Sequence, residues 1–444
     1  MSLIFTDRSR FVRGLKHCAR ARWLGYAYKG IGLRPRAEAL PLATGTAVHS
    51  PVTKALEWMR DNDEVPSREL MRAWIGEGAA AYKKKVAARG FDEGTSEEAG
   101  FIAGEQGSLI EGLAWVAWRV LLPWIHQEFR VLDVEREETF VAGCDCGLGD
   151  GVGEPADHAA RQNDQAHGTC NGVVVMSRPD FLLQRRSDGA IGVADLKTGA
   201  YPPRDMKGEE HIVQMAFGTL GAERRLGKAV THYYVVNLLK GKREVPYAQK
   251  GESGALKQQI SPLCYAWWRA GDPPFDKEEW KWEYTREKGF AKIPLWLSPA
   301  LAKLAAAAGM SPAEFWVMEM LPQEAVDGLV SVSPPFQRPD NLMNALVEEV
   351  VAEEREWAWK NEQIKGLEDP ALNQLVRRSW DCHNFYGRSC EFVGICSQGS
   401  GWEKPELLGR FVAREKHHAP ERVAFPTDPR TLGFSVVEGE EEEI

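Results

Sequence analysis

The chain has 444 residues, of which 43% are hydrophobic, 27% charged and 10% aromatic. This composition is typical of a globular protein with one or two domains and a core of substantial size. Its 55 Lys and Arg against 64 Asp and Glu give a net charge of -9, which excludes a uniformly basic, nucleic-acid-binding coat. Eight cysteines are too few for a small disulfide scaffold. Without a signal peptide or an uncharged membrane-spanning stretch, we expect a cytoplasmic protein and no membrane partner.

The N-terminal region is locally basic. Its first 36 residues hold nine Lys or Arg against one acid, Asp7. An amphipathic helix is predicted over residues 9–28, because apolar side chains recur at nearly helical spacing, at Phe11, Leu15, Cys18, Trp23 and Tyr26. Its basic face suits phosphates, although a solvated helix face explains the charges equally well. A second helix should start near residues 44–46, with His49 in its first turns.

Alternating apolar runs predict a central α/β region. The expected strands are Phe129–Val134, Thr139–Val141, Gly172–Met176, Phe181–Gln184, Ile191–Leu196 and Thr231–Leu239, with a helix around His211–Leu220. The predicted organisation is N-terminal basic helices (1–60), a helical insertion (61–130), a core (131–240, insert 142–170), a helical extension (241–375), a cysteine-bearing region (376–420) and an acidic, disordered tail (421–444). The 16 tryptophans are scattered through helical segments, which favours core packing over base stacking.

One predicted hairpin holds candidate metal-binding and catalytic residues. If Asp188 and Gly189 form a two-residue turn, positions that sum to 377 face each other, so Asp180 lies opposite Lys197. Asp195 shares the face of Lys197, because side chains two apart on a strand point the same way. Paired carboxylates bind a hard divalent cation, and a nearby lysine orients or deprotonates a water, as phosphodiester hydrolysis requires. The alternative is an exposed cross-strand salt bridge.

The spacing of this hairpin resembles that of the PD-(D/E)xK nuclease superfamily: Pro179-Asp180, 14 residues, then Asp195-Leu196-Lys197. The segment Gly45–His49 is similar to the Gly-Thr-x-x-His helix start of RecB-like nucleases. This resemblance implies a restriction-endonuclease-like central mixed sheet flanked by helices, with large helical insertions. It also implies a Mg or Mn ion held by His49, Asp180 and Asp195, and a catalytic set of Lys197, Asp180 and Asp195.

Two further residues resemble supporting positions of the same family. Glu135, placed on the strand-like run 131–134, resembles the Glu of the first core strand, although an acidic strand end facing solvent would look the same. Gln214 resembles the Gln of the family's Gln-x-x-x-Tyr helix motif. The fourth residue on is Gly218 instead of Tyr, a departure that weakens the inference of a substrate-positioning role.

Four cysteines at the two ends of the chain suggest a metal cluster. Cys382, Cys390 and Cys396 form a C-x7-C-x5-C run, and Cys18 stands near the other end. Four thiolates suit a 4Fe-4S cluster or zinc by ligand count, and the loose spacings favour iron. This arrangement, with one Cys before the core and three after it, resembles that of AddB-type recombination nucleases and CRISPR-adaptation exonucleases. The resemblance implies a C-terminal iron-sulfur region; unrelated buried cysteines are the alternative.

A second group of metal-ligand types lies in the Gly-rich and Asp-rich insert between two predicted strands. Its members are Cys144, Cys146, His158, His167 and Cys170. They are candidate zinc ligands, but their irregular spacing is equally that of residues gathered by chance in a long insertion.

These motifs together predict a metal-dependent DNA nuclease that uses Mg or Mn and carries a 4Fe-4S cluster. Analogy with the families it resembles favours an exonuclease in DNA processing, recombination or repair, with DNA and a helicase or recombination/integration protein as partners. The alternative from a different class is a catalytically silent DNA-binding or complex-assembly module, stabilised by a metal cluster.

Overall fold

The computed structural model describes the larger part of the chain. The described residues are 4–12, 18–30, 32–35, 40–89, 107–144, 172–199, 209–241, 243–247, 256–269, 299–337, 340–365, 367, 374–377, 390–396, 409–414 and 418. The structural statements below refer to these residues. Residues 145–170 of the predicted insert, Cys382 of the C-terminal cysteine run and the acidic tail lie outside them.

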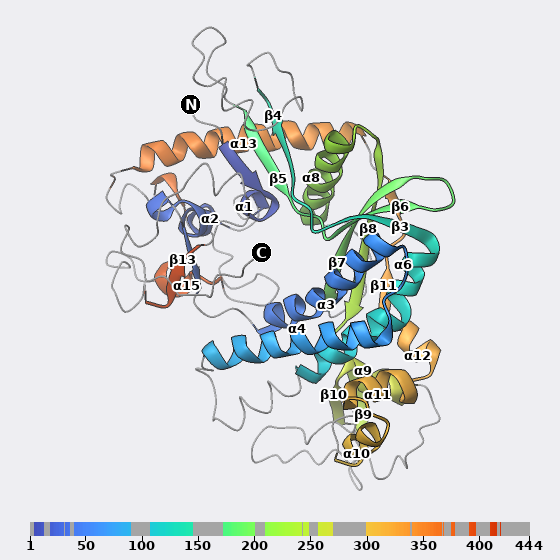
Figure 1. Cartoon of the computed structure of the whole chain (residues 1–444). Helices are drawn as coiled ribbons and strands as arrows, with labels where there is room; N and C mark the ends of the chain where they lie inside the picture. Colours follow the sequence, from blue (N-terminus) through green and yellow to red (C-terminus); the bar gives the residue numbers. More distant parts are fainter. Residues whose placement is uncertain are drawn as a thin grey trace.

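A mixed sheet forms the centre of the molecule (Figure 1). Its strands follow the order β11-β8-β7-β6-β3, and β12 also pairs with β8. Their bounds are β3 Phe129–Val134, β6 Phe181–Arg185, β7 Ile191–Gly199, β8 Val230–Leu239, β11 Val330–Val332 and β12 Phe336–Gln337. The pairing of β7 with β8 is parallel and the others are antiparallel. Parallel neighbours need a crossover, which α8 (Glu209–Leu226) supplies.

Alternation along β8 divides the side chains between the two faces of the sheet. Tyr233 and Val235 belong to a buried cluster with residues of α8, whereas Tyr234 and Val236 belong to the other large cluster, which contains residues of α3 (Leu40–Asn62). The sheet therefore has a helical layer on each face, which explains why β8 is a nearly continuous apolar run.

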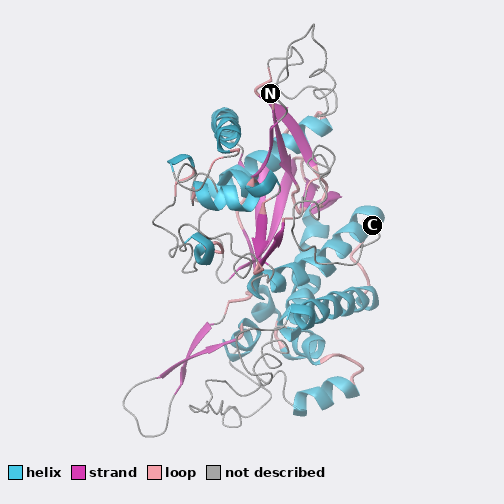
Figure 2. Ribbon diagram, turned by 90° about the vertical axis from the view of Figure 1, so that its left-hand side faces the viewer, coloured by secondary structure: helices cyan, strands magenta, loops and turns pink. Residues whose placement is uncertain are grey.

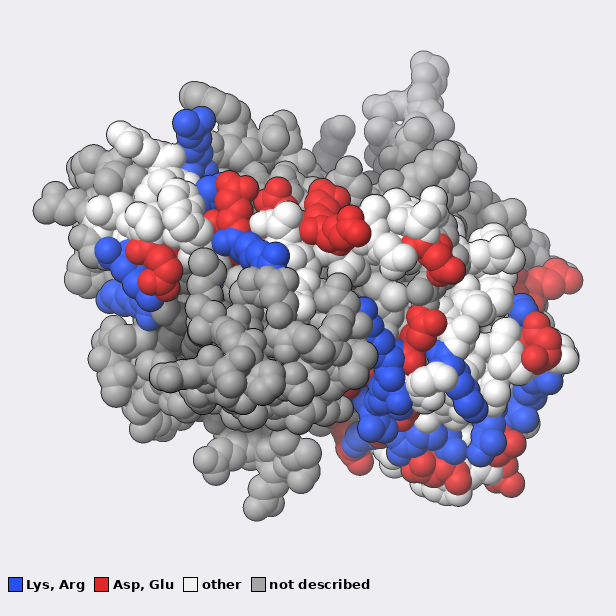
Figure 3. All heavy atoms as spheres, turned by 90° about the horizontal axis from the view of Figure 1, so that it is seen from above, with Lys and Arg blue, Asp and Glu red and all other residues white. Residues whose placement is uncertain are grey.

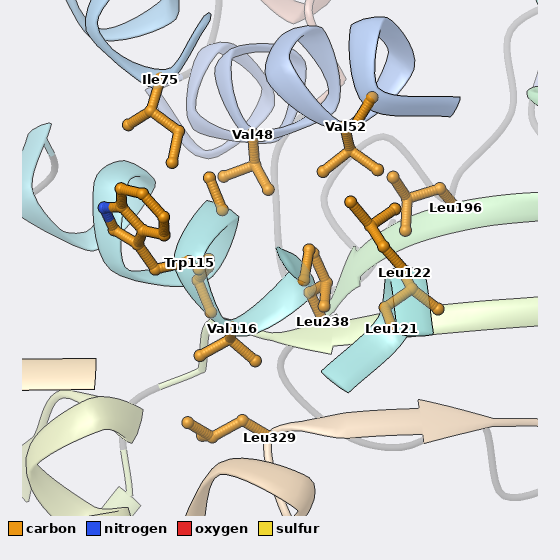
Figure 4. Packing of buried hydrophobic residues seen from close by; sticks show 14 of the residues in the cluster. Val48, Val52, Ile75, Trp115, Val116, Leu121, Leu122, Leu196, Leu238 and Leu329 are labelled. Carbon is orange, nitrogen blue, oxygen red and sulfur yellow. The ribbon is translucent and has the colours of Figure 1, made fainter. Parts of the chain in front are cut away.

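The larger hydrophobic cluster lies between the sheet and a layer of helices that includes α3 and the helical run 107–128. Figure 4 shows Val48 and Val52 of α3 pointing toward Trp115, Leu122 and Leu238. The helical run Gly107–Glu128 is long and apolar enough to cross a membrane, but 61% of its most apolar window is buried inside the protein. It includes the π-helical turn η3 (Ala117–Leu121) and α6 (Leu122–Glu128), and α4 (Arg68–Arg89) packs against α3.

A second, three-stranded sheet has the order β1-β5-β4. It consists of β1 Ile4–Asp7, β4 Glu138–Ala142 and β5 Val173–Ser177. The N-terminal strand β1 runs parallel to β5, and α1 (Arg8–Val12) follows it directly. Helix α13 (Asp340–Ile364) contacts this sheet and α8, and Figure 1 shows it running across the top of the molecule.

The two ends of the described chain meet in a small cluster of their own. Strand β2 (Leu33–Pro35) pairs with β13 (Phe411–Ala413). The shared hydrophobic cluster combines residues of α2 (Ala19–Tyr26) with residues of α13 and α15 (Val393–Cys396). Pairing between strands so distant in sequence fixes the N-terminal helices against the C-terminal segment.

Two buried arginines correct the prediction that the basic side chains of residues 9–28 project from the polar face of an amphipathic helix. Arg20 and Arg22 are only 1% and 2% exposed. Arg22 lies 2.5 Å from Glu354 and its guanidinium sits 4.6 Å from the centre of the Trp357 ring. Guanidinium groups enter an interior when a carboxylate and an aromatic face receive them. The predicted helix 9–28 is also divided into α1 and α2, with residues 13–17 outside the described part.

The region after β8 is less purely helical than predicted. It holds α9 Pro262–Arg269, α10 Pro299–Ala307, α11 Pro312–Phe315, η5 Trp316–Met320 and α12 Gln323–Asp327. It also holds β11 and β12 at the edge of the central sheet, and a separate ribbon of β9 (Arg243–Tyr247) and β10 (Leu256–Ile260). Figure 2 shows this ribbon extending away from the rest of the molecule. These short strands, with Pro, Lys and Gln among them, lack the apolar alternation that the prediction needed.

The predicted core elements are confirmed. All six expected strands and the helix after Lys197 occur; the strand ends are shifted by at most three residues, and the helix runs six residues beyond Leu220. The second helix starts at Leu40, four residues or more before the predicted start. Pro41 is compatible with this start, because the first turn of a helix has N–H groups without a helical acceptor and proline lacks an N–H.

Candidate active site

The β6–β7 hairpin has a different register from the predicted one. Its pairs, from Phe181 with Ala194 to Gln184 with Ile191, sum to 375 instead of 377. One step further along the same register, Asp180 lies level with Asp195, and Lys197 is two residues beyond. A shift of two residues keeps every side chain on its face. The expected grouping of Asp180, Asp195 and Lys197 on one face therefore survives the correction.

The turn explains this shift. Arg185 and Ala190 close the loop through an N–H to carbonyl bond of 2.8 Å, so four residues form the loop instead of two. Asp188 Oδ1 accepts a hydrogen bond from the Ala190 N–H at 3.0 Å, and Gly189 has a φ of +75°. An Asp that bonds its own main chain, followed by a Gly with positive φ, stabilises a four-residue loop as readily as a tight turn.

Asp180 is held across the hairpin. The main-chain N–H of Leu196 donates to Asp180 Oδ2 at 2.5 Å. Burial raises the pKa of the Asp180 carboxyl well above its ordinary value, and the negative charge of Asp195 raises it further, against the opposing effect of Lys197. Two buried carboxylates side by side repel each other, which is the electrostatic condition that a bound cation relieves.

Asp195 is the most enclosed of these acids, with a side chain only 2% exposed. Its Oδ1 accepts a hydrogen bond from Gln214 Nε2 on α8 at 2.6 Å. Its Oδ2 lies 2.6 Å from Lys197 Nζ in an ion pair. The lysine side chain is 35% exposed, so its ammonium lies between the buried carboxylate and solvent. The structure thus brings together Asp180, Asp195, Lys197 and Gln214.

His49 reaches the same site from α3. Burial lowers its pKa to about 4, the charge of Lys197 lowers it too, and Asp195 and Glu135 act in the opposite direction. At neutral pH its imidazole is therefore uncharged and retains a lone pair for a metal. A Cβ on Gly45, one helical turn earlier, would come 3.0 Å from Thr198 Oγ1. The glycine lets α3 approach the end of β7, which places His49 beside Lys197.

Glu135 follows β3 instead of lying on it, and its φ is +43°. Its main-chain N–H donates to the Asp180 carbonyl at 2.8 Å. Its side chain accepts hydrogen bonds from Thr53 Oγ1 at 3.0 Å and from Arg178 Nη2 at 2.8 Å. A left-handed conformation costs a non-glycine residue about 1 kcal/mol or more, and these contacts offset that cost. Glu135 thus lies beside the pair of acids formed by Asp180 and Asp195.

Two neighbours of the site were missed by sequence reasoning. Tyr233 on β8 is 1% exposed, and burial together with the charges of Asp195 and Asp180 raises its pKa well above its ordinary value. Arg8 donates through Nη1 to Gln214 Oε1. Tyr233 resembled an ordinary core aromatic in the sequence, and Arg8 was one basic residue among nine. Nothing in the sequence around either residue indicated that it belongs to the site.

Gly218, which stands where the family's helix motif has tyrosine, lies close to the hairpin. A Cβ on Gly218 would lie 3.4 Å from Val193 Cγ1 and 3.8 Å from Pro179 Cβ. These are ordinary contacts for a methyl group, but they leave little space for a larger side chain. Helix α8 therefore packs closely on the hairpin at the level of Pro179.

The chemistry of the residues fits a divalent metal ion. Within the described residues no three His, Cys, Asp or Glu side chains are arranged as a complete set of metal ligands. Mg²⁺ does not require one, because it is commonly held by one or two carboxylates, with waters and substrate phosphates completing its shell. Asp180 and Asp195, which lie level with each other, supply that pair, and the charge of Asp195 also acts on the neutral His49.

The cysteines are only partly placed. Cys18, Cys390 and Cys396 all border the hydrophobic cluster where the two ends of the chain meet. Cys18 precedes α2 and its Sγ lies 3.6 Å from the carbonyl oxygen of Arg377. Cys382 lies outside the described residues, as do Cys146, His158, His167 and Cys170 of the insert; Cys144 is described and is half-buried.

Charge on the molecular surface is mixed. Figure 3 shows a patch rich in Lys and Arg at one side of the upper face, with acidic side chains interspersed. Of the arginines of the hairpin, Arg185 pairs with Asp188 at 2.5 Å, and Arg186 pairs with Asp63. Part of the positive charge is thus already neutralised within the chain.

A family model described as the PD-(D/E)XK nuclease superfamily matches residues 12–397. The match covers most of the chain and includes the hairpin, α3 and α8. The chain belongs to the PD-(D/E)XK nuclease superfamily, whose membership indicates a metal-dependent nuclease that hydrolyses phosphodiester bonds. Comparison with curated proteins gives no match.

Proposed function

We propose that this protein is a Mg-dependent or Mn-dependent DNA exonuclease. The observation that carries the proposal is the group on one face of the β6–β7 hairpin. There Asp180 and Asp195 are level with each other, and Lys197 Nζ lies 2.6 Å from Asp195 Oδ2. An ordinary cross-strand salt bridge needs one carboxylate, and a second buried acid beside it only adds repulsion.

In this proposal Asp180, Asp195 and His49 hold the metal ion. When bound, the ion neutralises charge on the phosphate and acidifies a water. Lys197 orients the attacking water and stabilises the negative charge that develops on the phosphate. Gln214 fixes the orientation of the Asp195 carboxylate through its hydrogen bond to Oδ1. Glu135, at the rim, supports Asp180 through its main chain.

The preference for DNA ends rests on the resemblance to RecB-like nucleases. A helicase or recombination/integration protein that delivers such ends is the partner expected by analogy. We further propose a 4Fe-4S cluster on Cys18, Cys382, Cys390 and Cys396. Its support is that Cys18, Cys390 and Cys396 border one hydrophobic cluster although they come from opposite ends of the chain. The cluster would join those ends covalently through iron.

A silent DNA-binding module is the competing function. A module without chemistry has no need to bury two repelling carboxylates or to orient one of them with Gln214 and an ion-paired lysine. Such an arrangement lowers the stability of the metal-free protein. Its presence in the fold favours the enzyme.

The deciding experiment compares cleavage of end-labelled linear DNA and closed circular DNA, in single-stranded and double-stranded forms, with Mg or Mn or with a chelator. We expect metal-dependent release of nucleotides from linear substrates only. Lys197→Ala should bind Mn nearly as the wild type does, while cleavage falls by about 10²-fold to 10⁴-fold. Equal cleavage by the wild type and Lys197→Ala would reject the hairpin as the active site. Cutting of circular DNA would reject the exonuclease assignment alone.

A further inference from the structure

An arginine from the N-terminal segment reaches the carboxylate group through one intermediate side chain. Arg8, the first residue of α1, donates through Nη1 to Gln214 Oε1. Gln214 in turn donates through Nε2 to Asp195 Oδ1 at 2.6 Å. The result is a linear series of hydrogen bonds from Arg8 to the most buried acid of the site.

The chemistry of this series fixes the orientation of the glutamine amide. A guanidinium has donors only, and an ionised carboxylate has acceptors only. Because Arg8 must face an acceptor, the Gln214 oxygen turns toward it and the amide NH₂ turns toward Asp195. Without Arg8 the amide would keep only its bond to Asp195 and lose the bond at its oxygen, so Gln214 would hold the carboxylate less firmly.

The main chain on either side of Arg8 is itself held in place by other elements. Strand β1 runs parallel to β5, with Asp7 level with Met176. Asp7 Oδ1 accepts a hydrogen bond from the N–H of Arg10 at 2.8 Å, which closes the first turn of α1. Asp7 Oδ2 lies 3.6 Å from Arg414 Nη2 and 3.8 Å from His418 Nε2. The residue before Arg8 is therefore held by β5 and by the C-terminal segment.

We propose that Arg8 is a positioning residue of the nuclease site, which orients Asp195 through Gln214 for metal binding. The proposal rests on the proposed function of Asp195 as a metal ligand. It gives the segment 4–12 a role in the reaction, although it supplies no group that touches the metal or the substrate. Outer partners of metal ligands commonly change metal affinity or activity by about 10-fold to 100-fold when removed.

The test is a double-mutant cycle on the full chain with Arg8→Ala, Gln214→Ala and the combined variant, and with Mn affinity and cleavage measured separately. Titration calorimetry without DNA should show Mn binding weakened by about tenfold or more in Arg8→Ala. kcat should fall with little change in KM for DNA. In the Gln214→Ala background, Arg8→Ala should cost no more than about twofold further, because the two residues act in series.

Arg8→Lys and Ser9→Ala complete the design. Lysine keeps the charge and one donor, so Arg8→Lys should recover part of the Mn affinity, which loss of general packing would not allow. Ser9 is exposed on the same helix, so Ser9→Ala should match the wild type. If Arg8→Ala does not fold, as judged by circular dichroism, Arg8→Lys and Arg8→Gln are compared with wild type in the same assays.

The outcomes separate the two proposals. Wild-type protein that neither binds Mn nor cuts DNA contradicts the proposed function itself. Wild-type protein that does both, with Arg8→Ala unchanged in Mn affinity and kcat, overturns the role of Arg8 alone. Additive losses in the cycle, with a raised KM and a salt dependence reduced by about one unit in the slope, would mean that Arg8 contacts a DNA phosphate instead, and would also overturn it.

Discussion

The main-chain N–H of Leu196 donates a hydrogen bond of 2.5 Å to Oδ2 of Asp180. The strand that carries one acid of the site therefore fixes the orientation of the other. Because Leu196 stands between Asp195 and Lys197, a change in the hairpin register would move all of these groups together. The site is thus a property of strand pairing as much as of the individual side chains.

Asp180→Asn should raise the thermal stability of the metal-free protein while it weakens metal binding. The substitution removes one of two repelling buried acids, and the amide oxygen still accepts the Leu196 hydrogen bond. We expect the Tm without metal to rise by a few degrees, and Mn affinity to fall by at least about tenfold. Calorimetric scans with and without Mn measure both effects.

The control for this variant is Asp188→Asn, in the loop of the same hairpin, whose acid pairs with Arg185 in full solvent. It should leave Mn affinity unchanged. A metal-free Tm that falls in Asp180→Asn would contradict the electrostatic account of the site.

Gly45→Ala should impair the site through the position of α3. The new methyl would lie 3.0 Å from Thr198 Oγ1 and 3.8 Å from Lys240 Nζ, so α3 must move away from β7 by a few tenths of an ångström and take His49 with it. We expect weaker Mn binding and slower cleavage, at a stability loss of about 1 kcal/mol.

The double variant Gly45→Ala/Thr198→Ala tests this explanation. Removal of the Thr198 hydroxyl leaves space for the methyl group, so Mn affinity should return toward that of Thr198→Ala alone. Failure of the second substitution to restore Mn affinity would show that Gly45 matters for another reason.

Glu314→Gln should destabilise the protein at neutral pH by about 1.5–3 kcal/mol. The fully buried Glu314 carboxylate accepts hydrogen bonds from Arg68 Nε at 2.7 Å and from Arg72 Nη2 at 2.7 Å. Burial alone would raise its pKa, but the bonds from Arg72 and Arg68 outweigh burial and hold the pKa below its ordinary value.

The pH dependence of that loss follows from the lowered pKa. The carboxylate stabilises the fold fully above its unfolded-state pKa of about 4.5, and the contribution disappears as the pH falls through the lower folded-state pKa. Denaturant titrations between pH 7 and pH 3 should show the free energies of unfolding of wild type and Glu314→Gln converging at the acid end. A constant difference across that range would argue against the ion pairs as its cause.

Cys18→Ser should remove a cluster if the proposed iron-sulfur site exists. Wild-type protein purified without oxygen should contain about four irons per chain and absorb visible light. The variant should lose both the iron and the colour. Cys264→Ser, at a buried cysteine in the larger core, is the matched control and should keep them. Stoichiometric zinc without sulfide would contradict the iron assignment.

The central fold was largely predictable because its strands are long and apolar. Runs such as 233–239 and 191–196 are buried on both faces, so the sequence signal is strong. Short edge elements were not predictable: β1 has four residues and, among the described strands, pairs with β5, more than 160 residues away. Pairing at that distance leaves no local periodicity to detect.

The site was predictable where its chemistry is local in sequence. Asp180, Asp195 and Lys197 lie within one hairpin, and their shared face depends only on strand parity. The register itself was wrong because Asp188-Gly189 fits a longer loop as well as a two-residue turn. Tyr233 and Arg8 join the site only through tertiary packing, so no spacing in the sequence pointed to either.

The pairing of β2 with β13 has a consequence for synthesis of the protein. Residues 33–35 leave the ribosome early but find their partners only when residues 411–413 have followed. The same delay applies to Asp7, whose contacts include Arg414 and His418. The N-terminal segment that supports the carboxylates can pair with β5 earlier, but its contacts with the C-terminal segment form only after the whole nuclease core has been made. We expect a nascent chain, halted before residue 411, to be more open to proteolysis in its first 35 residues than the finished protein.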